Sequence, residues 1–153
     1  MSEACRIIRE CLEAGMTTNK SIDHHDYYVK TWFVGDPTPI NDTNLPAGVV
    51  DGVQPEIRET VFVGQDTATE TVSIKFFTKR DRRAEEEINI APGHTRLDAM
   101  VDRALQLLRT DPVFGCKVVT STIEVNRNAG APGTSFRVAE ITARLQRRVL
   151  WGD

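Results

Sequence analysis

Two segments of the chain place apolar residues with the spacing of an amphipathic helix. Between residues 2 and 14 they recur at intervals of three and four, and a wider apolar stripe runs from Thr95 to Arg109. The first stripe contains Ala4, Ile7, Ile8, Cys11 and Leu12, and the second contains Leu97, Met100, Val101, Ala104, Leu105 and Leu108. We predict two helices, the first ending near Gly15, and the second capped by Thr95 with Asp98 in a capping box and with His94 just before it.

Most of the remaining apolar residues alternate with polar ones, which is typical of strands. The clearest case is Thr69 to Lys79, where Val72, Ile74 and Phe76 share one face. Further strands are predicted at 28–34, 117–126 and 135–151, with two short strands or one bent strand within 47–63 and a Pro-rich loop at 35–46. The pattern predicts an α+β fold, in which a mixed, mainly antiparallel sheet is packed by the two helices.

The last predicted strand is much longer than usual. From Ser135 to Trp151 it would span roughly 55 Å at about 3.3 Å per residue, whereas most strands have about 5 or 6 residues. Its apolar face would contain Ala139, Ile141, Ala143, Leu145, Val149 and Trp151. We expect the strand either to bend sharply or to project past the domain. An exposed Trp151 would then be the kind of aromatic residue that interfaces bury.

Size and composition indicate an ordinary globular protein. A chain of 153 residues, 40% hydrophobic and 27% charged, is predicted to form a single domain, 1–153. A net charge of -3 disfavours a general binder of nucleic acid or of membrane surfaces, and the sequence has no apolar run long enough to span a membrane. Three cysteines without a C-x-x-C pair favour a reducing environment, so we expect the protein to act inside a cell, at least initially.

Residues 79–92 are predicted to form an exposed, charged hairpin or loop. Its basic half contains Lys79, Arg80, Arg82 and Arg83, and its acidic half contains Glu85, Glu86 and Glu87. Such a segment could become ordered on a partner. Together with Arg144, Arg147 and Arg148, its basic half also leaves open a nucleic-acid-binding function, although aromatic residues for stacking on bases are scarce.

No group of residues predicts catalysis or metal binding. His24 and His25, flanked by aspartates, are adjacent, so their side chains diverge and cannot both bind one metal ion. Cys5 and Cys11 are expected to be small core residues, and the common phosphate-binding and hydrolase motifs are missing from the sequence. We therefore predict no catalytic, metal-binding or cofactor-binding residues, no cofactor and no enzymatic activity.

Four stretches, in this order of elements, resemble the tail terminator proteins of long-tailed bacteriophages. They are WFVGDP at 32–37, LPAGVV at 45–50, TETVSIKFF at 69–77 and FRVAEITARLQ at 136–146. The resemblance spans nearly the whole chain. It implies a homohexameric ring that caps the finished tail tube, stops its polymerisation and offers its other face to the head connector. DNA would pass through the central channel without sequence-specific binding.

The resemblance also implies the partners and location of the protein. The expected partners are other copies of the chain, the tail tube protein and the head-tail connector or head completion protein, but no membrane. The expected location is the tail or neck of the virion, after assembly in the host cytoplasm. Alternatives are a head-tail joining, tail completion or tail tube protein and, more distantly, a nucleic-acid- or ligand-binding accessory domain. The residues predicted to make assembly contacts are Arg80, Arg82, Arg83, Glu85, Glu86, Glu87, Arg144, Arg147, Arg148 and Trp151.

Overall fold

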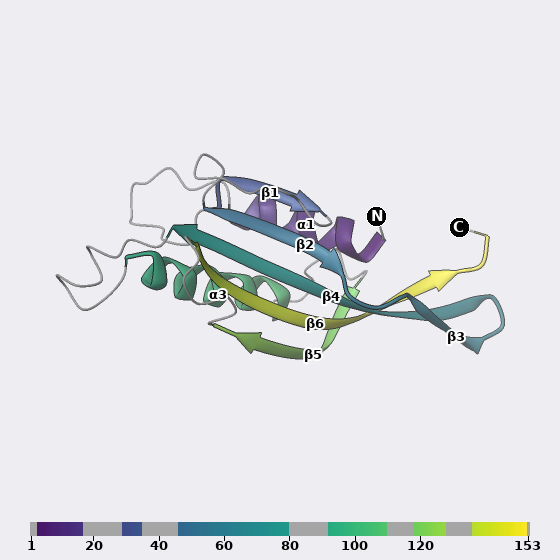
Figure 1. The fold of residues 1–153 in the computed structure, drawn as a ribbon. Helices are drawn as coiled ribbons and strands as arrows, with labels where there is room; N and C mark the ends of the chain where they lie inside the picture. Colours follow the sequence, from purple (N-terminus) through teal and green to yellow (C-terminus); the bar gives the residue numbers. More distant parts are fainter. Residues whose placement is uncertain are drawn as a thin grey trace.

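The computed structural model of the chain describes residues 3–16, 29–34, 46–79, 92–109, 118–127 and 136–152 (Figure 1). These residues form two helices and a six-stranded, mostly antiparallel sheet. In chain order the elements are α1 (Glu3–Met16), β1 (Thr31–Val34), β2 (Ala47–Gly52), β3 (Ile57–Phe62), β4 (Gln65–Lys79), α3 (Pro92–Arg109), β5 (Val118–Asn126) and β6 (Phe136–Leu150). The predicted α+β fold class is confirmed.

The two longest strands, β4 and β6, form the centre of the sheet. They pair antiparallel along their whole lengths, from Gln65 opposite Leu150 to Lys79 opposite Phe136. The strand order is β1-β2-β4-β6-β5, and only the pairing of β1 with β2 is parallel. Both β2 and β3 pair with β4, the first along 72–77 and the second along 65–69. The segment expected to form two strands or one bent strand is therefore two strands that follow one edge of β4.

Both helices cover the same face of the sheet, and the core lies between the two layers. Val72, Ile74 and Phe76 of β4 are fully buried there, as their alternation predicts. Helix α1 packs against β1 and β2, and α3 packs against β4 and β6. From α3 the core receives Leu97, Met100, Val101, Ala104 and Leu108, and from β6 it receives Ala139, Ile141, Ala143 and Leu145. The predicted apolar face of α3 and most of that of β6 are thus confirmed.

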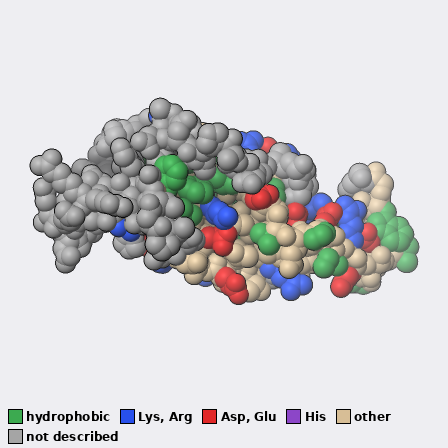
Figure 2. All heavy atoms as spheres, in the orientation of Figure 1, with side chains coloured by type: hydrophobic (Ala, Val, Ile, Leu, Met, Phe, Trp, Pro, Cys, Tyr) green, Lys and Arg blue, Asp and Glu red, His purple; other side chains and the backbone are tan. Residues whose placement is uncertain are grey.

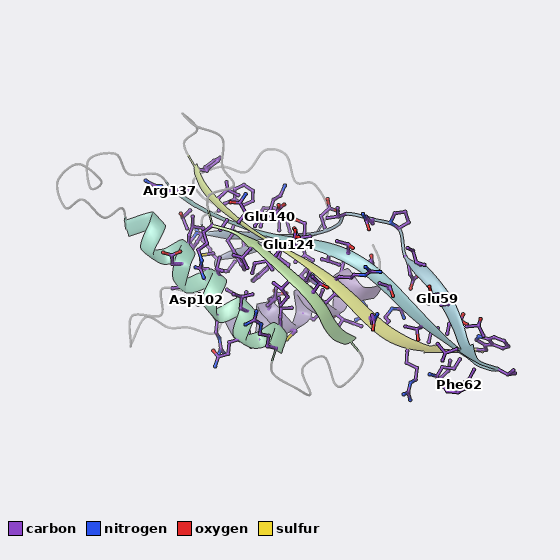
Figure 3. The ribbon with its side chains drawn as sticks, turned by 90° about the horizontal axis from the view of Figure 1, so that it is seen from below. Glu59, Phe62, Asp102, Glu124, Arg137 and Glu140 are labelled. Atoms are coloured by element: carbon purple, nitrogen blue, oxygen red, sulfur yellow. The ribbon has the colours of Figure 1, made fainter. Side chains whose placement is uncertain are left out.

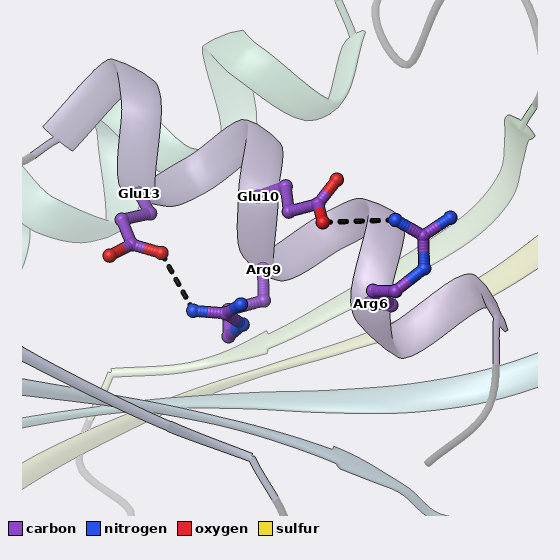
Figure 4. A network of polar contacts seen from close by, with 4 residues as sticks. All are labelled: Arg6, Arg9, Glu10 and Glu13. Atoms are coloured by element: carbon purple, nitrogen blue, oxygen red, sulfur yellow. Dashed lines mark hydrogen bonds and ion pairs between the residues drawn. The ribbon is translucent and has the colours of Figure 1, made fainter.

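Helix α1 turns its apolar side to the core and pairs its charged residues along the helix. Ile8 and Leu12 are fully buried, Cys5 is buried and Cys11 is half-buried, and neither cysteine forms a disulfide within the described residues. On the polar side Arg6 Nη1 donates to Glu10 Oε1 at 2.9 Å, and Arg9 Nη1 donates to Glu13 Oε2 at 2.7 Å (Figure 4). The helix ends at Met16, next to the predicted Gly15.

The predicted start of α3 is wrong by one turn. The helix begins at Pro92, whose fixed φ and missing N–H suit the first helical position, so Thr95 lies inside the helix and cannot be its cap. His94 is likewise in the first turn and not before it. The carboxylate of Asp98 accepts a hydrogen bond from Arg127 Nη1 at 3.0 Å, across to the end of β5.

The long strand β6 projects past the body of the protein, as its length allowed. Together with β3 and the first residues of β4 it forms a three-stranded arm beyond the helices (Figures 1 and 3). All six residues of β3 are exposed, although their alternation predicts a half-buried strand. The reason is that no helix in the described part of the chain reaches this end of the sheet. None of the described helices is both long and apolar enough to cross a membrane.

Candidate assembly surface

Large apolar side chains gather at the end of the arm, where nothing in the described structure covers them (Figure 2). Val63 is 93% exposed and Phe62 is 66% exposed, and the remaining four residues are between 50% and 56% exposed. We call this group the apolar tip: Ile57, Val61, Phe62, Val63, Leu150 and Trp151. Phe62 lies at the far end of the sheet from Arg137 (Figure 3), so the tip is remote from the core.

Strand pairing sets three residues of the tip on one face of the arm. Phe62 is opposite Gln65, which is in turn opposite Leu150, so these three side chains point the same way. Ile57 is opposite Thr69 and lies on that same face. Between Ile57 and Phe62 the pairing of β3 with β4 shifts register, at a bulge or irregularity between Thr60 and Phe62.

Hydrogen bonds hold the end of β6 against the β3–β4 turn. The main-chain N–H of Trp151 donates to the carbonyl oxygen of Gly64 at 2.8 Å, and its indole Nε1 donates to Asp66 Oδ1 at 2.9 Å. Thr60 Oγ1 donates to the same carboxylate oxygen, also at 2.9 Å. Gly64 has a φ of 90°, which a residue with a side chain adopts only with strain. We refer to these bonds as the Trp151 clasp, because they fix an exposed aromatic ring in place.

The clasp lowers the pKa of Asp66. The largest cause is the hydrogen bond from Trp151, followed by the one from Thr60, and the charge of Arg58 acts in the same direction. Each of these favours the ionised carboxylate, and desolvation, whose effect is larger than that of Arg58, opposes them. Asp66 is therefore a charged acceptor at neutral pH, and charged acceptors make the stronger hydrogen bonds.

An ion-pair cluster joins the strands nearer the base of the arm. Arg147 Nη2 of β6 lies 2.6 Å from Glu56 Oε1, and Arg58 Nε of β3 lies 3.5 Å from Glu56 Oε2. Glu56 thus connects the two outer strands of the arm across β4. Arg147 therefore forms an ion pair within the chain, and its predicted role as an assembly contact stays a prediction.

The structure does not bring the predicted arginines of β6 into one patch. Successive residues of a strand point to opposite faces, so Arg144 and Arg148 share one face while Arg147 lies on the other. Arg144 and Arg148 are exposed, and Trp151 is exposed at the end of the arm as expected. The other six predicted contacts, Arg80, Arg82, Arg83, Glu85, Glu86 and Glu87, lie outside the described residues.

Sequence reasoning missed most of the apolar tip, including Phe62, Val63 and Leu150. One local signal was present: Val61, Phe62 and Val63 are three consecutive apolar residues just before a glycine turn. Strict alternation would place a polar residue at the middle position, whereas three apolar residues in a row put apolar side chains on both faces of the strand.

The described residues contain no group of three or more His, Cys, Asp or Glu side chains that could hold a metal ion. His24, His25 and Cys116 lie outside those residues. The prediction that the protein is not an enzyme is therefore untested and stays a prediction.

The four stretches that carry the resemblance to tail terminators become neighbouring strands. They contain most of each of β1, β2, β4 and β6, which are consecutive in the sheet. Trp32 of the first stretch is opposite Gly48 of the second, and its ring meets Phe76 of the third edge to face at 6.0 Å and 79°. No model of a known protein family matches the chain, and a search of curated proteins also finds no match.

Proposed function

We propose that this protein is a structural component of the phage virion, the subunit of a tail terminator ring. The ring caps the finished tail tube, blocks the addition of further tube subunits and presents a new face to the head connector. Its action is steric and needs no catalytic group. The ring lies in the tail or neck, is assembled in the host cytoplasm, and lets DNA pass without reading its sequence.

The observation that carries the proposal is the apolar tip at the end of the arm. Burying an aliphatic side chain is worth about 1.5–3 kcal/mol at about 25 cal/mol per Å², which corresponds to about 60–120 Å², and an aromatic side chain covers about 150–250 Å². At the exposures given above, the six side chains of the tip present roughly 500 Å² of apolar surface. The largest apolar patch of a typical monomer measures about 300–600 Å² and is often functional, so the tip is a candidate interaction site.

The form of the arm also supports assembly over ligand binding. The tip is convex and lies outside the core, whereas small-molecule sites are concave and enclosed. In the described part of the chain the outer edges of β1, β3 and β5 are unpaired. Open edges attract further strands, and a closed ring of subunits is one way to cover them.

The test has two steps. Electron microscopy and mass measurement of the purified protein should show closed rings. Adding the protein to the cognate tail tube protein during polymerisation should then give shorter tubes with a ring at one end.

Each alternative function has its own outcome in this test. Incorporation along the length of the tubes would identify a tail tube protein, and binding to the connector without any effect on tube length would identify a head-tail joining protein. A salt-sensitive DNA gel shift by the monomer would favour the nucleic-acid-binding alternative. A chain that stays monomeric at high concentration, both alone and with tube protein, contradicts the proposal.

A further inference from the structure

The two open edges of the sheet nearest the arm face in opposite directions. Strand β6 occupies one edge of β4 along its whole length, so β3 must lie on the other edge, the same one as β2. Strand β5 lies beyond β6, at the far side of the sheet. Within the described residues neither the outer edge of β3 nor that of β5 has a partner strand.

The direction of these two strands suits a head-to-tail repeat. Both β3 and β6 are antiparallel to β4, and β5 is antiparallel to β6, so β3 and β5 run in opposite directions. A second copy in a similar orientation, displaced sideways, would therefore bring its β5 edge to the β3 edge of the first copy as an antiparallel pair. Antiparallel pairs are the commoner kind and slightly the more stable.

Pairing of β3 with its own copy is disfavoured. In such a symmetric pair one residue lies opposite the same residue of the other copy. If that residue is Arg58 or Glu59, two like charges face each other. Centring it on Thr60 places the register shift between Thr60 and Phe62 in the middle of the pair. Pairing with a different edge avoids these three arrangements.

The lengths of the strands favour β5 as the edge that pairs with β3. β3 has 6 residues, β5 has 9 and β1 has 4, so only β5 can pair with the whole of β3. On β5, Val125 is 39% exposed and supplies an apolar side chain beside the edge.

The size of the tip matches one interface with one partner. A standard interface buries about 800 Å² on each side, of which about 57–65% is apolar, or roughly 450–520 Å². The tip presents roughly 500 Å² of apolar surface, as estimated above. The apolar area of the tip is therefore comparable to that of one side of such an interface.

We propose that the arm of one subunit docks on the β5 edge of a second copy of this chain, so that the neighbour covers the apolar tip. Repetition of this contact is heterologous and closes into a ring when the rotation between subunits allows it. The docking deepens the proposed function and depends on it, because it takes self-assembly as given.

The experiment uses two variants of the full chain that remove opposite halves of the contact. Phe62→Asp with Val63→Asp disables the tip, and Val125→Asp disables the receiving edge. All three positions are exposed, so thermal melts followed by circular dichroism should match those of the unmodified protein. Gln106→Asp, at an exposed position on α3, adds the same kind of charge at a residue that belongs to neither the tip nor β5, and it is the control.

We expect the two variants to associate with each other but not with themselves. Each disabled variant alone should stay monomeric by mass photometry, with self-association weakened at least about 30-fold, as for a hot spot of about 2 kcal/mol. The control should assemble normally. An equal mixture of the tip variant and the edge variant should give dimers and nothing larger, because only one intact tip and one intact edge can meet.

Other outcomes overturn the proposal in distinguishable ways. If the unmodified protein forms rings and the tip variant does too, the arm is not the contact, but the ring function stands. If the edge variant forms dimers alone, the tips pair with each other. If the unmodified protein is monomeric throughout, the proposed function fails as well.

A second measurement does not depend on these variants. In a Trp32→Phe background, the emission of Trp151 should shift to shorter wavelength as concentration drives assembly. Unchanged emission across assembly would mean that the tip stays in water, which also overturns the proposal.

Discussion

Replacing Gly48 by alanine is expected to destabilise the protein through one contact between β1 and β2. An alanine Cβ at this position would lie 2.6 Å from Cζ3 and 2.7 Å from Cε3 of Trp32. Carbon atoms in contact are usually about 3.5–4.0 Å apart, so the indole must move by about 1 Å. A rigid ring cannot yield locally, and the whole Trp32 side chain has to rotate.

The expected loss of stability follows from what this rotation disrupts. Forcing a side chain off its rotamer costs about 0.5–1.5 kcal/mol, and losing the edge-to-face contact of Trp32 with Phe76 costs a further 0.5–1.5 kcal/mol or so. Against this, alanine restricts the unfolded chain and returns about 0.4–1 kcal/mol. The free energy of unfolding should therefore fall by about 1–2 kcal/mol.

Urea unfolding followed by circular dichroism measures this loss. With a slope of about 2 kcal/mol per M, the midpoint should fall by about 0.5–1 M. Gly52→Ala is the matched control, because the same change in the same strand would place its Cβ 3.6 Å from Glu70 Oε1, which is ordinary contact. Gly52→Ala should shift the free energy of unfolding by no more than about 0.5 kcal/mol.

A double-mutant cycle with Trp32→Leu tests the cause. If the indole is the obstacle, Gly48→Ala should cost less than about 0.5 kcal/mol once the ring is removed. Equal losses in the two backgrounds, or equal effects of Gly48→Ala and Gly52→Ala, would refute the steric reasoning.

Three further predictions concern the arm and the surface. Because the folded pKa of Asp66 is depressed, the Trp151 clasp should be intact above the ordinary value of 3.8 and open as the pH falls below it. The emission of Trp151 in the Trp32→Phe background should report this transition, and Asp66→Asn should abolish it. Gly64→Ala should strain the turn by about 1–2 kcal/mol and raise hydrogen exchange in the arm, while exchange in the core stays unchanged. Arg127→Gln should remove the ion pairs with two aspartates of α3 and lower stability by about 0.5–1 kcal/mol; thermal melts in about 1 M salt should show no such difference from the unmodified protein.

Residues whose burial follows from local periodicity could be predicted from the sequence. The stripe of α3 and the alternation of Val72, Ile74 and Phe76 on β4 gave the correct elements and the correct buried faces. The length of the last strand allowed its projection past the body to be anticipated. In these elements the sheet and the helices cover each other as two regular layers. The spacing of the apolar residues is therefore enough to predict which side faces inward.

The start of α3 was missed because two plausible signals compete within four residues. Thr95 with Asp98 has the spacing of a capping box, and Pro92 is a good first helical residue. In the structure the helix begins at Pro92, and the carboxylate of Asp98 accepts a hydrogen bond from Arg127, which is distant in the sequence.

The sequence alone thus determined the fold class, the two helices, the central strands and the apolar faces that form the core. Only the tertiary structure decided that β3 lies beyond the helices, that Trp32 packs over Gly48 and that Arg147 binds Glu56. Periodicity reports that a face is apolar, but whether another layer covers that face depends on where strands far apart in the chain come together. For this reason the apolar residues Val72, Ile74 and Phe76 of β4 are buried beneath the helices, whereas Ile57, Val61 and Phe62 of β3 are exposed.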